Sequence, residues 1–134
     1  LGEMLPRGQK CLSIDVDGLV RGKFVYELGD RDFYLYEKPK DHTHLAGAIL
    51  FNGTGRSADF LNQYATELRN SVQADNLYWF LDQVVLDHIV PQYKKGLLPM
   101  SYIDWGMRTD SAIWSAKGRR KELAVFTQEQ QKYQ

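Results

Sequence analysis

Short apolar runs alternate with stretches of helical periodicity along this chain, and this alternation constrains the fold more than any other feature. Apolar runs at 10–14 and 45–51 predict buried strands, and alternating aromatics at 32–36 predict another. A further short strand is predicted at 97–103. The polar segment 37–44 interrupts this series and is predicted to be a loop.

Two helices are predicted in the middle of the chain. From Phe60 to Val72 apolar residues recur at spacings of three and four, and Ser57 is a suitable N-cap. The second helix is predicted over 77–89, with His88 packed on its apolar stripe and Pro91 ending it. Strands that alternate with helices predict an α/β domain, with a mixed sheet flanked by helices.

Length and composition limit the kinds of protein that this chain can be. Its 134 residues suit one domain, or a fragment of one, with a basic and polar tail at about 115–134 that we expect to fray. Leu1 in place of Met suggests an excerpt of a longer chain. The 17 basic and 17 acidic residues cancel, so a nucleic-acid partner is not expected. The apolar runs are too short for a membrane span and no secretory signal is visible, so we expect a cytoplasmic protein.

An acidic pair follows the first predicted strand. Asp15 and Asp17 are two positions apart, so in an extended chain their side chains point the same way. Both carboxylates could reach one hard divalent cation, Mn²⁺ or Mg²⁺, which prefers oxygen ligands and keeps positions open for phosphate oxygens. The simpler alternative is a pair of solvated carboxylates in a turn.

One family that uses a similar segment is the haloacid-dehalogenase-like phosphatases. Asp15-Val16-Asp17-Gly18 resembles their strand-Asp-x-Asp-Gly motif, which implies Asp15 as nucleophile and Asp17 as acid and base. The rest of that pattern fits poorly, because no acidic pair follows a second apolar strand and Asp104 is solitary.

More of the chain resembles the metal-dependent glycosyltransferases of the GT-A fold. Residues 12–22 resemble their apolar strand with Asp-x-Asp and a following Gly, and 44–54 resemble the next strand. Trp79-Phe80-Leu81-Asp82-Gln83 resembles their helix with an Asp-Gln pair. The order of these segments covers most of residues 10 to 90. The resemblance implies the half of a GT-A domain that binds metal and acceptor, and transfer of a sugar from a nucleotide-diphosphate donor to an acceptor hydroxyl.

The same resemblance implies roles for individual residues. Asp15 and Asp17 would hold Mn²⁺ or Mg²⁺ on the diphosphate, and Asp82 with Gln83 would position or deprotonate groups at the sugar carbon. Two further groups would shape the floor of the sugar site and cover the diphosphate. They are Gly47, Ala48 and Asn52 for the floor, and Lys117, Gly118 and Arg119 for the diphosphate.

The chain also departs from the GT-A pattern. Only about ten residues precede Cys11, so the half that holds the nucleoside is missing, and no His follows His88 to complete a metal site. A sugar-binding or partner-binding domain without catalysis is therefore a third interpretation.

Two other groups of residues are candidates for binding. His42 and His44 flank Thr43 and could bind a metal or line an acceptor pocket, although they suit an ordinary loop equally well. Tyr102, Trp105 and Trp114 cluster around Asp104, and they suit either a sugar pocket or the core.

Overall fold

A computed structural model describes residues 8–22, 29–99, 101–116 and 118–133 of the chain. Its main element is a mixed four-stranded sheet with the order β1-β4-β3-β5, in which β4 is antiparallel to β1 and β3, and β5 is parallel to β3. These strands are β1 Cys11–Ile14, β3 Phe33–Glu37, β4 His44–Phe51 and β5 Lys95–Leu97.

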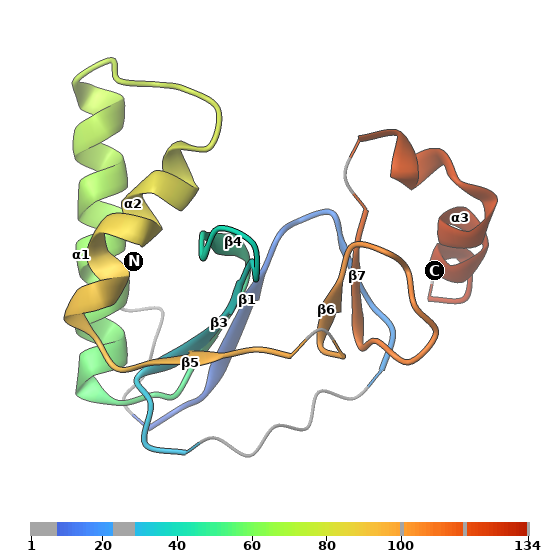
Figure 1. Cartoon of the computed structure of the whole chain (residues 1–134), viewed down its shortest axis with the longest axis horizontal. Coiled ribbons are helices and arrows are strands. Elements are labelled where there is room, and N and C mark those ends of the chain that lie inside the picture. Colours follow the sequence, from blue (N-terminus) through green and yellow to red (C-terminus); the bar gives the residue numbers. More distant parts are fainter. Residues whose placement is uncertain (1–7, 23–28, 100, 117, 134) are drawn as a thin grey trace.

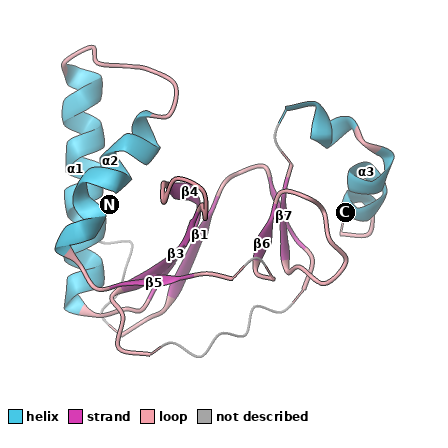
Figure 2. Cartoon of the chain, viewed as in Figure 1, coloured by secondary structure: helices cyan, strands magenta, loops and turns pink. Residues whose placement is uncertain are grey.

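Helices cover one face of this sheet, and a smaller sheet with its own helices lies beyond the other (Figures 1 and 2). The smaller sheet is also mixed, with the order β2-β7-β6. We call this sheet and the helices that follow it the C-terminal module. The helices that cover the main sheet are α1 Gly55–Gln73, α2 Leu81–Ile89 and the 3-10 helix η1 Val90–Gln92. The C-terminal module consists of β2 Gly18–Val20, β6 Ile103–Asp104, β7 Ile113–Ser115, the 3-10 helix η2 Gly118–Glu122 and α3 Ala124–Gln131.

The alternation of side chains along β3 and β4 divides the core in two. Phe33, Leu35 and Ile49 face the helices, where Phe33 stacks on Phe60 of α1 with ring centroids 3.9 Å apart. The side chains that alternate with these along β3 and β4 point to the other face of the sheet. They belong to a second cluster, which joins the sheet to the C-terminal module. This second cluster contains Tyr34, Ala48, Leu50, Leu98, Ile103 and Ile113. The α/β class predicted from the sequence, with mixed sheets and flanking helices, is confirmed.

The predicted elements are largely present, with corrections at their ends. Thr54 is the N-cap of α1, because its hydroxyl accepts the Ser57 amide at 3.1 Å; Ser57 itself lies inside the helix. The strand predicted at 97–103 is wrong: the Tyr102 amide donates to the Pro99 carbonyl at 2.9 Å, and this turn separates β5 from β6.

Three other expectations also differ from the structure. The last twenty residues do not simply fray, because η2 and α3 form there and Phe126 of α3 is buried against Trp114 and Ala116. His88 is exposed on α2 and is not packed in the core. His44 belongs to β4 and is buried, whereas a polar loop was expected. Within the described parts of the chain, no helix has both the length and the apolar character needed to cross a membrane.

Candidate functional site

An open cleft of about 360 Å³ lies where β1 ends, between α2 and η2. Asp15 and Asp17 follow β1, and they form the base of the cleft. One wall comes from the start of α2 and the loop before it, and the other from η2. The cleft is lined by Asp15, Asp17, Trp79, Phe80, Asp82, Gln83, Gly118 and Lys121.

The backbone of β4 supports Asp15 from below. The pairing of β3 with β4 is irregular between Leu35 and Tyr36, and Gly47 lies in the part of β4 that this irregularity skips. The Gly47 carbonyl accepts the Asp15 amide at 3.0 Å. A Cβ atom at position 47 would lie 3.1 Å from Oδ2 of Asp15, so the absence of a side chain there leaves room for this carboxylate. The structure therefore places Gly47 beside Asp15, and its role in the floor of the sugar site stays a prediction.

Asp17 makes an ion pair across the cleft. One of its oxygens, Oδ2, lies 2.6 Å from the Lys121 ammonium, and the two side chains are 30% and 44% exposed. Its other oxygen, Oδ1, is buried and has no hydrogen-bond partner among the described residues. A buried carboxylate oxygen without a donor is costly, so this atom is well suited to accept a cation or a donor from a ligand.

Asp82 and Gln83 enter the cleft from the first turn of α2. Phe80 directly precedes α2 and is its N-cap residue, with a left-handed backbone conformation and a φ of 74°. Tyr64 of α1 lies behind them, and its hydroxyl donates to the Asp82 carbonyl at 3.4 Å. Burial, followed by the negative charges of Asp82 and Asp15, raises the pKa of Tyr64 above its usual value.

The cleft offers carboxylate oxygens, which are the kind of ligand that a hard divalent cation prefers. Asp15 and Asp17 supply carboxylate oxygens, and Oδ1 of Asp17 needs a partner. No group of three or more His, Cys, Asp or Glu side chains surrounds a common metal position in the described part of the chain. A cation here would therefore have at most two described protein ligands of these kinds, and its other positions would be left to water or phosphate.

The other predicted site residues lie in different places. Gly118 lines the cleft, while Arg119 is exposed on η2 and does not line it. Ala48 is buried in the core cluster beneath the C-terminal module. Asn52 follows β4, and its amide donates to the carbonyls of Gly29 and Arg31 at 3.0 and 2.8 Å. Neither Ala48 nor Asn52 lines the cleft, and Lys117 lies outside the described residues.

The two predicted histidines belong to an ionic cluster at the edge of the main sheet. His42 Nδ1 lies 2.7 Å from Glu37, and His44 Nδ1 lies 2.6 Å from Asp87. Lys95 bonds to both Glu37 and His44. The hydrogen bond from Lys95, and then that from His42, lower the pKa of Glu37 to about 2. The carboxylates and the ammonium account for the described polar contacts of both histidines, which is a structural role.

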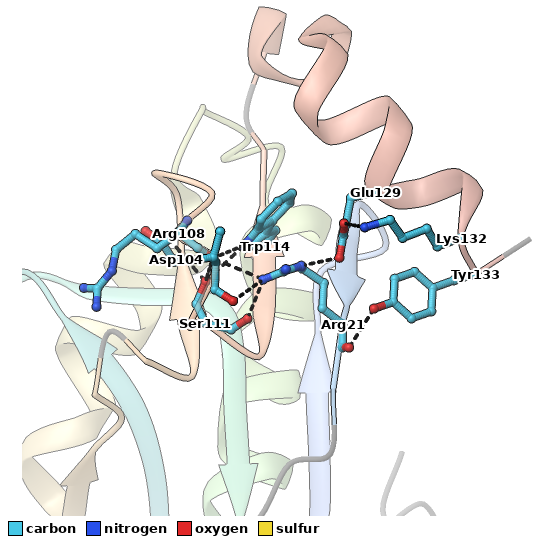
Figure 3. Close-up of polar contacts among 9 residues, drawn as sticks. Arg21, Asp104, Arg108, Ser111, Trp114, Glu129, Lys132 and Tyr133 are labelled. Atoms are coloured by element: carbon cyan, nitrogen blue, oxygen red, sulfur yellow. Dashed lines mark hydrogen bonds and ion pairs between the residues drawn. The ribbon is translucent and has the colours of Figure 1, made fainter.

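The aromatic cluster near Asp104 divides between a core and a surface. Trp114 is buried and donates its indole N–H to the Arg108 carbonyl at 2.7 Å, while the Arg21 guanidinium lies 3.9 Å above its ring (Figure 3). Arg21 also forms an ion pair with Glu129 of α3 at 2.8 Å, which ties α3 to this sheet. Trp105 lies elsewhere, against Tyr36 with ring centroids 4.9 Å apart.

Three residues of the cleft were not predicted from the sequence. The sequence pattern predicts only a basic tail around Lys121, and its partner Asp17 is distant along the chain. Trp79 and Phe80 were assigned to a helix, although they precede α2 and are 83% and 52% exposed. The exposure of two adjacent aromatic side chains is a property of the folded chain, and the sequence pattern does not predict it.

Comparison with known proteins supports the fold assignment. No protein-family model matches the chain, and no curated protein matches its sequence. Two solved structures are similar to it, each at 15% sequence identity. The glycosyltransferase GlyE of Streptococcus pneumoniae TIGR4 matches 87% of the chain with a TM-score of 0.61, and the galactosyltransferase LgtC, in complex with donor and acceptor sugar analogues, matches 98% with a TM-score of 0.63.

These similarities establish the fold of the chain. It resembles the GT-A glycosyltransferases GlyE and LgtC over most of its length, as the sequence predicted. The match spans 36% of the GlyE chain and 64% of the LgtC chain, so the chain corresponds to only a part of either protein.

Proposed function

We propose that this chain is the metal- and acceptor-binding part of a glycosyltransferase, which moves a sugar from a nucleotide-diphosphate donor to an acceptor hydroxyl. The observation that carries the proposal is the cleft itself. Residues from three distant segments, namely Asp15 with Asp17, Asp82 with Gln83, and Gly118, line one cavity on a GT-A-like fold.

Asp15 and Asp17 would hold Mn²⁺ or Mg²⁺ in this reaction. When bound, such a cation supplies positive charge to the diphosphate and stabilises it as a leaving group. Gly47 supports the arrangement because its missing side chain leaves space beside Oδ2 of Asp15. The buried Oδ1 of Asp17 would gain the partner that it lacks among the described residues.

The wall formed by η2 would supply further positive charge. The Lys121 ammonium lies in the cleft, where it neutralises Asp17 and where it can also contact a phosphate oxygen. Gly118 leaves the neighbouring backbone open to a close approach, since nothing lies within 4 Å of a Cβ built at this position. The role of Lys117 and Arg119 in offsetting the charge of the diphosphate stays a prediction, because Arg119 does not line the cleft and Lys117 lies outside the described residues.

Asp82 and Gln83 would act at the transferred sugar. The oxygen of the acceptor hydroxyl bonds to the anomeric carbon, while the bond from this carbon to the diphosphate oxygen breaks. The hydroxyl proton passes to the Asp82 carboxylate, and the electron pair of the broken bond leaves with the diphosphate. The Gln83 amide can both donate to and accept from sugar hydroxyls, so it suits a positioning role.

Calorimetric measurement of Mn²⁺ and UDP binding tests this proposal. We expect Mn²⁺ to bind the wild-type chain, UDP to bind only together with Mn²⁺, and both signals to fall at least about tenfold in Asp17→Asn. Asp110→Asn is the matched control, because Asp110 is an exposed carboxylate paired with Arg108 outside the cleft. Equal binding by wild type and Asp17→Asn would contradict the proposal.

The same proteins separate the two alternatives. Hydrolysis of p-nitrophenyl phosphate that disappears in Asp15→Asn would favour the phosphatase interpretation over a transferase. No response to Mn²⁺ and UDP, in wild type and in Asp15→Ala alike, would favour a binding domain without metal chemistry.

A further inference from the structure

A second groove opens beside the cleft and shares two of its residues. It has a volume of about 310 Å³, at the lower end of the range of small-molecule sites. Phe80 and Gln83 line both cavities, so the two cavities adjoin at these side chains. The groove is lined by Tyr36, Lys38, Leu45, Phe80, Gln83 and Trp105.

The composition of this groove is that of a carbohydrate site. Tyr36 and Trp105 pack at 52° to one another and are both only half-buried, so part of each ring faces the groove. Leu45 adds an apolar floor, while Gln83 and Lys38 provide polar groups at the rim. Aromatic faces combined with a few convergent polar groups match a pyranose ring, which has an apolar C–H face and hydroxyls around its edge.

The backbone of Phe80, one of the two residues that line both cavities, has a strained conformation. Its φ of 74° is unusual for an aromatic residue and costs about 1–3 kcal/mol. The Gln83 and Val84 amides both donate to the Phe80 carbonyl, at 3.1 and 3.0 Å, which holds the residue in place at the start of α2. The ring remains 52% exposed, so burial of this side chain does not explain the conformation. This conformation therefore leaves an exposed aromatic ring beside both cavities.

We propose that this groove binds the acceptor as a neutral pyranoside, stacked on Tyr36 and Trp105, with its reactive hydroxyl directed past Phe80 to Gln83 and Asp82. The inference rests on the proposed transferase function, because the cleft would hold the donor sugar. In the step described above, the acceptor hydroxyl supplies the attacking oxygen, the anomeric carbon exchanges its bond to diphosphate for a bond to this oxygen, and Asp82 takes the proton.

Titration with methyl β-D-galactopyranoside and methyl β-D-glucopyranoside, without donor or metal, tests the groove. The chain has three tryptophans, so its indole N–H signals in ¹⁵N NMR spectra can be assigned by substitution. We expect at least one glycoside to shift the Trp105 signal and to leave the signal of the buried Trp114 unchanged. Tyr36→Ala should weaken this binding at least tenfold.

Two further variants protect the test against misfolding. Phe80→Gly suits the positive φ and removes the shared wall, so it should fold normally and still weaken glycoside binding several-fold. Tyr78→Ala is the control, because Tyr78 is an exposed aromatic close by that lines neither cavity, and it should bind as wild type does. No shift of the Trp105 signal by either glycoside, or equal binding by Phe80→Gly and wild type, would overturn the inference.

Failure of the groove and failure of the proposed function give different results. If Mn²⁺ and UDP bind through Asp17 but no glycoside reaches Trp105, the acceptor assignment is wrong and the transferase proposal stands. If glycosides bind at Trp105 but Mn²⁺ and UDP do not bind, the acceptor role is overturned and the groove is a glycoside-binding site only.

Discussion

Carboxylates at the ends of two strands have very different environments in this molecule. Asp104, at the end of β6, is 1% exposed, and its oxygens accept the amides of Gly106 and Arg108 at 2.7 and 2.5 Å. Asp17, beyond the end of β1, has one oxygen on an ammonium and one without a described partner. An acidic residue after a strand is therefore not by itself a sign of function; what matters is whether the fold already satisfies its oxygens.

The largest effect should come from removing the satisfied carboxylate. Asp104→Ala leaves two backbone amides without acceptors in a buried loop, so we expect a loss of about 3 kcal/mol in the free energy of unfolding. Urea unfolding followed by circular dichroism measures it. Asp17→Asn, which changes a partly exposed pair, should cost less than about 1 kcal/mol. A reversed order of these two losses would break the comparison.

Gly47→Ala sharpens the comparison by disturbing only the functional side. The new methyl group would crowd Oδ2 of Asp15, which can move because it ends a side chain. We expect little change in stability and a weakening of Mn²⁺ binding by roughly tenfold, or about 1.4 kcal/mol. Calorimetric titration measures the binding. Unchanged affinity would mean that the position of this carboxylate does not matter to the metal.

Lys121→Met removes the cation that competes for Asp17. Because an exposed ion pair contributes little to stability, folding should be nearly unaffected. Mn²⁺ binding should strengthen roughly fivefold, since the metal no longer shares the Asp17 carboxylate with a nearby ammonium. Lys121→Arg keeps the charge and serves as the control in the same titration. Weaker Mn²⁺ binding in Lys121→Met would show that Lys121 does not oppose the metal.

The smallest effect concerns a third carboxylate, Glu37 at the end of β3. The ammonium of Lys95, followed by His42, lowers its pKa from 4.5 to about 2. A carboxyl group with a lowered pKa in the folded state stabilises the protein above pH 4.5, and this contribution is lost as the pH falls from 4.5 toward 2. Glu37→Gln should therefore show a smaller drop in urea midpoint between pH 5 and pH 3 than wild type. An equal drop would contradict the assignment.

The contrast between Asp17 and Asp104 also explains what the sequence could predict. The strand before Asp15, the long helix after Thr54 and the Asp-Gln pair on α2 follow local patterns, and their order was enough to indicate the GT-A fold. Whether a carboxylate is satisfied depends on contacts that fold topology creates. Nothing near Asp17 in the sequence points to Lys121, and nothing near Asp104 shows that its loop turns back onto it.

The same reasoning explains the errors among the floor residues. Gly47 and Ala48 are adjacent in β4, so the pattern treats them alike. In a strand they point to opposite sides, and the irregular pairing with β3 directs one toward Asp15 and the other into the core. Lys121 and Trp79 were missed for a different reason, because their role comes from elements that meet only in three dimensions.

The division of the core along β3 and β4 has a mechanical consequence for the cleft. The α2 wall of the cleft is packed in the core cluster on one face of the main sheet. The η2 wall belongs to the C-terminal module, which lies on the opposite face. The Lys121–Asp17 ion pair ties the η2 wall to the turn after β1. A small rotation of one layer relative to the other would therefore change the width of the cleft. The turn after β1, which carries Asp15 and Asp17, would be the hinge of this motion.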